Sequence, residues 1–328
     1  MLCPLRESQA TAELIMNRLT GMKIGIAGVV LSLSALFGVQ ASANSPAGCD
    51  SCVFTLPTVP ASMTEVVQRA EYVAVHYWQG LDYSDTAWLA DPLALEQVFV
   101  DWIPVVAQLP PDRLAIAAET VITHGNGYPA MQQRLGELSE IYFYEPDSPY
   151  RNEELYIPIL HALMAAPAIG GIYKKRYQYQ LDKAMKNSPG TQASDFTFIT
   201  SEHMSQRLSD FRSDYVLLYF FNPDCSECRK TAAYISASPV FSALLEDKRL
   251  TVLAVYPFED LQAWDRSIDE MPRGWIVAHY AGEDDRNSYH LLSIPSLYLL
   301  DREKNVILKD ACVALIENRL RGEMYKSE

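Results

Sequence analysis

The chain has 328 residues, of which 49% are hydrophobic and 21% are charged, an ordinary composition for a globular protein that is long enough for two domains. Its formal net charge at pH 7 is −14. Nucleic acids and anionic membranes both require basic surfaces on a protein, so we expect neither of them as a main partner.

The N-terminal region has the pattern of a secretory signal peptide. Lys23 directly follows Met22 and precedes an apolar stretch over residues 24–39, and the small residues 41–43 form an A-x-A cleavage site. The apolar stretch is short for a transmembrane helix. We therefore predict that residues 1–43 are a signal peptide, with translation starting at the first residue or at Met22. The expected location is the periplasm or cell envelope, and an uncleaved N-terminal anchor is the alternative.

The next segment, residues 44–61, is small, polar and proline-containing, and it carries Cys49 and Cys52. An exported chain meets an oxidising compartment, in which cysteines pair. Three interpretations stay open: a local disulfide between Cys49 and Cys52, a lipid on Cys49, or an auxiliary pair that exchanges with a second cysteine pair farther along the chain. Membrane contact is expected only if Cys49 carries a lipid.

Residues 62–188 have the apolar spacing of three and four that is typical of amphipathic helices. Ser62 and Glu65 have the spacing of a capping box, Asp91 is the expected cap of a second helix, and Gly125 is the expected end of a third. The predicted helices of this all-α domain lie over residues 62–81, 91–109, 110–125, 128–144, 152–167 and 170–187. The aromatic side chains that we expect in its core, rather than along a groove, are Tyr77, Trp78, Tyr83 and Trp88.

At Ser188 the pattern changes to alternating strands and helices, and we predict a second domain over residues 189–328. The runs 215–222 and 250–257 are almost continuously apolar, as in strands that are buried on both faces of a sheet. Shorter strands are predicted over 193–200, 273–280, 296–301 and 305–310, and helices over 228–238, 259–271 and 311–322. This order predicts an α/β fold: a central mixed sheet with an antiparallel edge, flanked by helices.

Cys225 and Cys228 lie where one of the buried strands ends and a helix begins. A helix N-terminus carries unpaired N–H groups and a partial positive charge, which stabilise a thiolate. The thiolate is the attacking species in disulfide exchange. The placement predicts that Cys225 is the exposed nucleophile and that Cys228, one helical turn deeper, is the resolving cysteine.

Four charged side chains flank the pair and are expected to modulate the pKa of its thiols. Arg229 and Lys230 favour a thiolate, whereas Asp224 and Glu227 oppose it. The sign of their combined effect does not follow from the sequence.

Zinc binding and a structural disulfide are the alternatives for the C-x-x-C pair. A zinc site needs a second ligand pair at suitable spacing, and Cys49 and Cys52 lie far away beside a flexible tail, so no metal and no cofactor are expected. The position in a strand–helix–strand pattern favours a redox pair over a structural disulfide. Cys312 begins the last predicted helix in an apolar setting, and we interpret it as a buried, inert thiol.

Two motifs within residues 190–310 resemble the thioredoxin superfamily, and its exported thioredoxin-like thiol-disulfide oxidoreductases in particular. The first is the A-x-D-F-x-F sequence of an opening strand over residues 193–198, and the second is the sequence SIPSLYLLD over 293–301. The resemblance implies a thioredoxin fold with a cis Ile294–Pro295 bond packed against the cysteine pair. It also implies that the backbone of Ile294 pairs with a bound substrate strand.

The helical half resembles the N-terminal domain of unknown function that some of these exported proteins carry. The residues that carry this resemblance are the sequences AEYVAVHYWQGLDYSDT over 70–86 and RNEELYIPIL over 151–160. That domain brings no known activity with it.

The chain departs from the family pattern at the positions that handle protons. Tyr219 stands six residues before the first cysteine, where thioredoxins carry a buried acid, and Thr231 stands where some members carry a glutamate. Ser226-Glu227 replaces the frequent Gly-Pro between the cysteines. Glu227 is therefore the nearest candidate acid or base for Cys228, and a solvated helix residue is the alternative.

Together these features predict an exported thiol-disulfide oxidoreductase. Disulfide-containing proteins are the expected substrates, and a membrane or periplasmic protein is the expected electron donor. Ile294 resembles the residue before the proline in reducing members, which favours reduction. A thiol peroxidase is one alternative, although Asn222 stands where that enzyme would need a threonine. A non-catalytic partner-binding scaffold with a structural disulfide is the other, although it would not need both cysteines.

Overall fold

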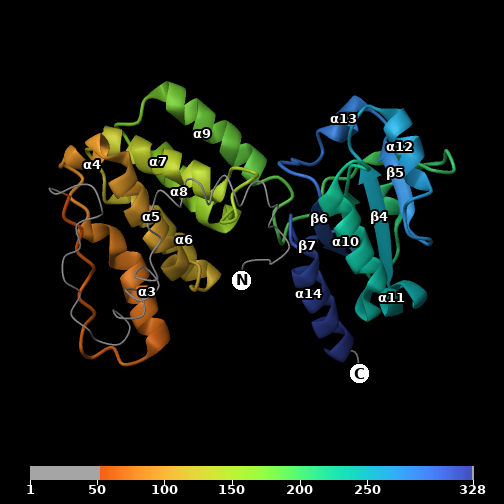
Figure 1. Cartoon of the computed structure of the whole chain (residues 1–328), viewed down its shortest axis with the longest axis horizontal. Coiled ribbons are helices and arrows are strands. Elements are labelled where there is room, and N and C mark those ends of the chain that lie inside the picture. Colours follow the sequence, from red (N-terminus) through yellow and green to blue (C-terminus); the bar gives the residue numbers. More distant parts are fainter. Residues whose placement is uncertain (1–51, 327–328) are drawn as a thin grey trace. The chain divides into compact units, whose positions relative to one another are not determined.

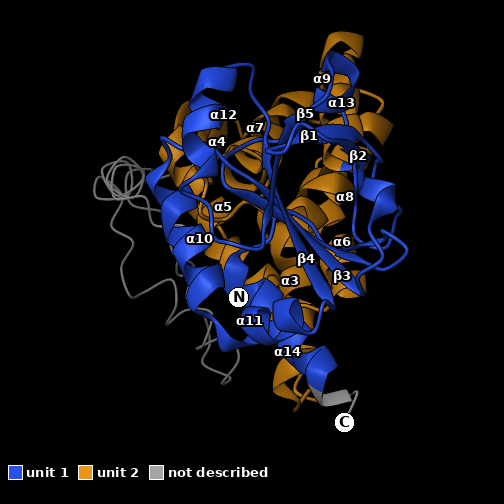
Figure 2. Cartoon of the chain, turned by 90° about the vertical axis from the view of Figure 1, so that its right-hand side faces the viewer, with its two compact units in different colours: residues 1–8, 185–328 blue, residues 9–184 orange. Residues whose placement is uncertain are grey.

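The structure is a computed structural model that describes residues 52–326. Its described residues form two compact units that divide between Ala184 and Met185, close to the predicted domain boundary at 188 (Figure 2). The predicted signal peptide and Cys49 lie outside the described residues. None of the helices within residues 52–326 combines the length and the apolar character that crossing a membrane requires.

The first unit along the chain, residues 52–184 (orange in Figure 2), is helical, as predicted (Figure 1). Its elements are α3 Val66–His76, η1 Tyr77–Gly80, α4 Ala87–Ala90, α5 Pro92–Val106, α6 Pro111–Thr123, α7 Pro129–Phe143, α8 Glu153–Ala165 and α9 Gly171–Ala184. Asp91 caps α5 as expected, because its carboxylate accepts a 3.2 Å hydrogen bond from the backbone N–H of Ala94. The predicted cap at Ser62 is wrong: a turn closed by the bond from Met63 N to the Pro60 carbonyl precedes Glu65, and α3 begins after it.

Aromatic side chains fill the core of the helical unit. The rings of Trp78, Phe99, Trp102 and Phe143 are fully buried, and their neighbouring centroids lie 5.5–6.2 Å apart in tilted and edge-to-face pairs. The aromatic residues that the sequence assigned to this core, at 77, 78, 83 and 88, are all at most 8% exposed. They are packing residues and do not line a groove.

The second unit along the chain, residues 185–326 (blue in Figure 2), is built on a seven-stranded mixed sheet in the order β2-β1-β5-β4-β3-β6-β7. The strands are β1 Thr197–Thr200, β2 Ser205–Arg207, β3 Tyr215–Phe220, β4 Leu250–Tyr256, β5 Ile276–Tyr280, β6 Ser296–Asp301 and β7 Val306–Leu308. β3, β4 and β5 are parallel, and β6, β7, β1 and β2 join antiparallel on the two sides. The predicted α/β fold with a mixed sheet is confirmed, and β2 is a short strand that the sequence analysis missed.

Helices flank this sheet (Figure 1). They are α10 Ser226–Ala237, α11 Pro239–Glu246, α12 Leu261–Ile268, α13 Glu283–Arg286 and α14 Val313–Lys326, with η2 Leu208–Asp210 before β3. The sequence analysis did not predict α11. Ser238 caps it by accepting a 3.4 Å hydrogen bond from Phe241 N, and Pro239 occupies its first turn.

The apolar run of β3 is explained by burial on both faces. Leu217, Tyr219 and Phe221 project into the core that α10, α11, α12 and α14 cover. The alternate residues of the strand, 216, 218 and 220, project into the core on the opposite face. Because β3 lies between β4 and β6, its C-terminal end places the following loop at the middle of the sheet edge.

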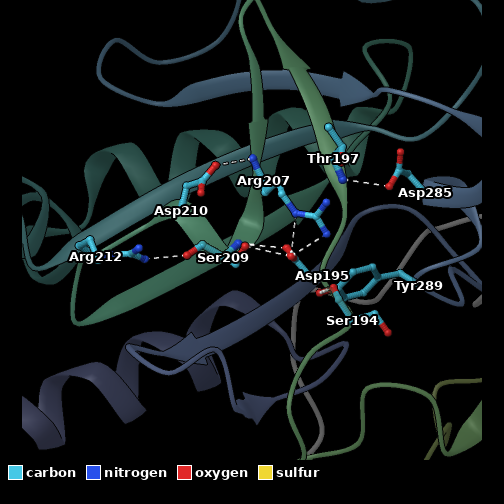
Figure 3. Close-up of polar contacts among 9 residues, drawn as sticks. All are labelled: Ser194, Asp195, Thr197, Arg207, Ser209, Asp210, Arg212, Asp285 and Tyr289. Atoms are coloured by element: carbon cyan, nitrogen blue, oxygen red, sulfur yellow. Dashed lines mark hydrogen bonds and ion pairs between the residues drawn. The ribbon is translucent and has the colours of Figure 1, made fainter.

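The A-x-D-F-x-F motif organises the start of the second unit (Figure 3). The carboxylate of Asp195 binds the Arg207 guanidinium and accepts hydrogen bonds from both N–H and hydroxyl of Ser209, at 2.9–3.0 Å. Phe196 and Phe198 are fully buried in the core below. The motif thus ties β1 to β2 through its acid and anchors both in the sheet through its aromatic residues.

Candidate active site

A tight turn carries the chain from β3 to the first cysteine. The backbone N–H of Cys225 donates to the carbonyl of Asn222 at 3.1 Å, and the N–H of Asp224 donates to the Asn222 side chain at 3.0 Å. Asn222-Pro223 is a sequence that favours such a turn. The turn reverses the chain directly after the buried strand and delivers Cys225 to the start of α10.

Cys225 is the N-cap residue of α10. Its backbone is extended, with φ −88° and ψ 116°, and its sulfur accepts a hydrogen bond from the N–H of Cys228 at 3.1 Å. The side chain is half-buried. The sulfur therefore occupies the place where a helix N-terminus stabilises negative charge, while it stays reachable from solvent.

Cys228 lies one turn deeper and is only 2% exposed. Burial, followed by the hydrogen bond with Cys225, raises the pKa of the Cys228 thiol well above its ordinary value. Both cysteines are free thiols. The pair is therefore asymmetric, with an accessible sulfur at the helix terminus and a shielded sulfur behind it.

The second predicted motif meets the pair in space. The Ile294–Pro295 peptide bond is cis, as the family resemblance implies. The Cys225 thiol lies 3.7 Å from the carbonyl oxygen of Ile294. Two segments that are far apart in the sequence thus form one site, with the accessible sulfur facing the backbone before the proline.

The four flanking charges are engaged in different ways. The Arg229 guanidinium donates to the Pro223 carbonyl at 2.6 Å, which holds the turn against α10. Lys230 pairs with Glu227 at 2.7 Å, and Asp224 is exposed. Arg229 is therefore a clamp of the turn as well as a positive charge; the effect of all four on the thiol pKa stays a prediction.

Beside Cys228 the site continues into a cavity of about 280 Å³. Tyr219 forms part of its wall, and its hydroxyl donates a 2.7 Å hydrogen bond to the carbonyl oxygen of Cys228. Glu270, from the loop between α12 and β5, lines the same cavity. The sequence analysis missed Glu270, because no local pattern links that loop to the cysteines.

The remaining cysteine predictions have mixed outcomes. Cys52 is disulfide-bonded and fully buried, but Cys49 lies outside the described residues, so their pairing stays a prediction. Cys312 is half-buried and disulfide-bonded, so its interpretation as a buried, inert thiol is wrong. Apolar neighbours indicated burial, but they do not distinguish a thiol from a disulfide. Within residues 52–326, no group of three or more Cys, His, Asp or Glu side chains is placed to hold a metal ion.

Comparisons with known proteins give matches for both halves of the chain. A family model of a domain of unknown function, DUF5106, matches residues 31–187. A crystal structure of a thioredoxin-like protein from Bacteroides caccae is 36% identical with a TM-score of 0.78, over 82% of this chain and 98% of that chain.

Two shorter structures match part of the chain. One is the C-terminal domain of an uncharacterized protein from Bacteroides fragilis, 34% identical with a TM-score of 0.40, over 42% of this chain and 99% of that chain. The other is the thioredoxin domain of a thiol-disulfide oxidoreductase from Bacteroides vulgatus, 26% identical with a TM-score of 0.38, over 42% of this chain and 97% of that chain. No curated protein matches the chain.

Proposed function

The chain belongs to the family of thioredoxin-like proteins, and from this premise we propose that it is an extracytoplasmic thiol-disulfide oxidoreductase that reduces protein disulfides. The observation that carries the proposal is the asymmetry of the cysteine pair. Cys225 is accessible at a helix N-terminus and faces Ile294, whereas Cys228 is buried behind it. A structural disulfide has no need of this division between an exposed and a shielded sulfur.

The reaction proceeds in two exchanges. The Cys225 thiolate attacks one sulfur of the substrate disulfide, so that a mixed disulfide forms and the other substrate sulfur leaves as a thiolate. The Cys228 thiolate then attacks the Cys225 sulfur. The Cys225–Cys228 disulfide forms, the mixed disulfide breaks, and the second substrate thiolate leaves and takes a proton. The substrate gains two electrons, and the pair loses them.

The backbone around Ile294 is suited to hold a substrate strand beside the nucleophile. Its carbonyl faces the Cys225 sulfur, and its side chain packs against the cores on both faces of the sheet. A rigidly held peptide segment offers backbone hydrogen bonds without reading a sequence. The proposed substrates are therefore disulfides in extended segments of exported proteins, and turnover requires an electron donor that reduces the oxidised pair again.

The turn before Cys225 argues against the peroxidase alternative. That activity needs a threonine hydroxyl three residues before the reactive cysteine, and here Asn222 uses its side-chain oxygen to bind the Asp224 N–H. This side chain closes the turn and is not available as a peroxide ligand.

The test is reduction of a protein disulfide substrate such as insulin with dithiothreitol as electron donor. The wild-type protein is expected to accelerate reduction, Cys225→Ser to abolish the acceleration, and Cys228→Ser to accumulate a mixed disulfide at Cys225. Ser226→Ala, which changes the exposed residue between the cysteines, is the matched control and is expected to form and resolve the mixed disulfide. Reduction at the wild-type rate by Cys225→Ser would contradict the proposal.

A further inference from the structure

The second exchange requires that a proton leave the Cys228 thiol and be taken up by an acceptor. The thiol is 2% exposed, and burial holds its pKa high, so bulk solvent is a poor acceptor. The residue at the position of the usual buried acid is Tyr219, whose own burial raises its pKa. A neutral hydroxyl of this kind can donate a hydrogen bond, but it cannot take the proton.

The cavity beside Cys228 connects this buried thiol to the surface. Its inner wall consists of the buried residues Tyr219, Phe221 and Cys228, and its outer wall includes the exposed residues Ala233 and Glu270. A space of about 280 Å³ with polar groups at both ends is large enough to hold several water molecules. Waters in such a space can carry a proton between groups that do not touch.

Only a few groups that face this cavity can take part in proton transfer. Among the described residues that line it, the titratable or charged ones are Tyr219, Cys228, Arg229 and Glu270. Arg229 offers only hydrogen-bond donors, and it is bound to the Pro223 carbonyl. Glu270 is thus the carboxylate of the cavity wall. Glu227, the candidate from the sequence, is paired with Lys230 and is not part of this wall.

Tyr219 is placed to support the thiolate once the proton has left. Its hydroxyl donates to the Cys228 carbonyl at 2.7 Å, on the same residue as the thiol. Among the influences on the thiol, burial is the largest and raises its pKa, whereas the nearby Tyr219 side chain lowers it. When the Cys228 thiolate forms, rotation of the Tyr219 hydroxyl would turn its hydrogen from the Cys228 carbonyl toward the negatively charged sulfur.

We propose that the cavity is the proton route of the resolving step, in which Glu270 accepts the Cys228 proton through cavity water and the Tyr219 hydroxyl stabilises the resulting thiolate. The proposal rests on the proposed disulfide exchange and adds two positioning residues to it. The proton moves from the Cys228 sulfur to Glu270, and the Cys228 thiolate then attacks the Cys225 sulfur of the mixed disulfide. The departing substrate thiolate is protonated by solvent.

The experiment separates the two exchanges in single turnovers. Reduced protein is mixed with a peptide disulfide, and acid quenching with mass spectrometry follows the formation and the decay of the mixed disulfide. Glu270→Gln is expected to form the mixed disulfide at the wild-type rate and to resolve it about tenfold more slowly at pH 7, in the lower range of general-base effects. The deficit is expected to shrink toward pH 10, where hydroxide replaces the lost acceptor.

Matched variants distinguish the proposed roles from general effects. Asp269→Asn removes a charge from the neighbouring exposed residue, which does not line the cavity, and is expected to resolve like the wild type. Tyr219→Phe is expected to shift the pH dependence of resolution upward. Tyr280→Phe, which removes a buried hydroxyl on the opposite face of the sheet, is expected to leave it unchanged.

Resolution of Glu270→Gln at the wild-type rate, or equal slowing by Asp269→Asn, would overturn the proposed proton route. Failure of every form, Cys228→Ser included, to produce a mixed disulfide would instead overturn the proposed function. The two failures are therefore distinguishable in one series.

Discussion

The hydroxyl oxygen of Tyr219 and the carbonyl oxygen of Cys228 lie 2.7 Å apart, although the two residues belong to β3 and α10. The hydrogen bond fastens the central strand to the first turn of the helix that carries both cysteines. The Tyr219 ring packs between Phe221 and Trp275, with centroids 5.7 and 5.8 Å away. A side chain that is fixed on both sides in this way holds Cys228 at a set depth below Cys225.

Removal of this hydroxyl is expected to destabilise the second unit. Tyr219→Phe should lower the free energy of unfolding by about 1 kcal/mol, the usual net value of a buried hydrogen bond. Urea denaturation followed by circular dichroism measures the change. The control is Tyr280→Phe, because the buried Tyr280 hydroxyl has no hydrogen-bond partner within residues 52–326, and its loss should be neutral or stabilising. Equal destabilisation by the two variants would show that the Cys228 contact contributes nothing specific.

The two thiols are expected to differ strongly toward alkylating agents. Cys225 is half-exposed, whereas Cys228 is almost inaccessible and its pKa is raised by burial. Iodoacetamide between pH 7 and pH 9 should therefore label Cys225 and leave Cys228 unmodified, as read by peptide mass spectrometry. The same reaction in guanidinium chloride should label both residues. Preferential labelling of Cys228 in the folded protein would refute the assignment of nucleophile and resolving cysteine.

Acid should weaken the packing behind α10 through Glu317 of α14. Its carboxylate accepts hydrogen bonds from Tyr234 of α10 at 2.5 Å and from Ser238 at 2.8 Å, and pairs with Arg321 at 3.0 Å. Burial alone would raise the pKa of Glu317, but these three contacts outweigh burial and lower it. The stabilisation is therefore complete above the unfolded-state pKa of about 4.3 and is lost as the pH falls through the lower folded-state pKa.

Glu317→Gln should accordingly remove about 2 kcal/mol of stability at neutral pH, the scale of hydrogen bonds to a buried charged group. Its stability should also depend less on pH below about 4.3 than that of the wild type. Thermal or urea unfolding at several pH values measures both effects. The control is Glu323→Gln on the same helix, because the ion pair of Glu323 with the exposed Arg319 should contribute little to the free energy of unfolding. A wild-type pH profile for Glu317→Gln would contradict the assignment.

Gly80 should tolerate no side chain. A Cβ atom at this position would lie 2.0 Å from the carbonyl oxygen of Thr55, which is a backbone atom, so the chain itself would have to shift. Gly80→Ala is expected to lower the stability of the helical unit by about 1–3 kcal/mol, as overpacking does. Gly171→Ala is the control, because nothing lies within 4 Å of the new Cβ. Thermal melting of both variants decides, and a Gly80→Ala variant as stable as the wild type would show that the Thr55 contact does not constrain the fold.

The sequence predicted those features whose cause is local. The apolar run 215–222 identified β3 because both faces of a central strand are buried, and Asp91-Pro92 identified the start of α5 because cap and first turn are adjacent in sequence. Cys225 was placed at a helix N-terminus by the same kind of local evidence. In contrast, the prediction that Ile294 lies close to the cysteine pair came from a family motif and not from periodicity.

Features with distant or competing causes escaped the sequence. The capping-box spacing of Ser62 and Glu65 failed because Ser62 belongs to a turn over residues 60–63, so that α3 begins only after Glu65. The short strand β2 takes its place from pairing with β1, not from its own polar sequence. Glu270 reaches the cysteine site only through the folding of the loop between α12 and β5. The proposal of Glu270 rather than Glu227 as the proton acceptor therefore required the structure.

The central claim is that Cys225 and Cys228 form a reversible redox couple, and the most direct test is a redox titration of that pair. The protein is equilibrated in glutathione or dithiothreitol buffers, thiols are trapped by alkylation, and the oxidation state of the pair is read by mass spectrometry, with the Cys49→Ser/Cys52→Ser variant beside the wild type. We predict one two-electron transition at roughly −270 mV or lower, as expected of a reductase. A potential near roughly −120 mV would reverse the proposed direction, and the absence of any reversible transition would contradict the claim itself.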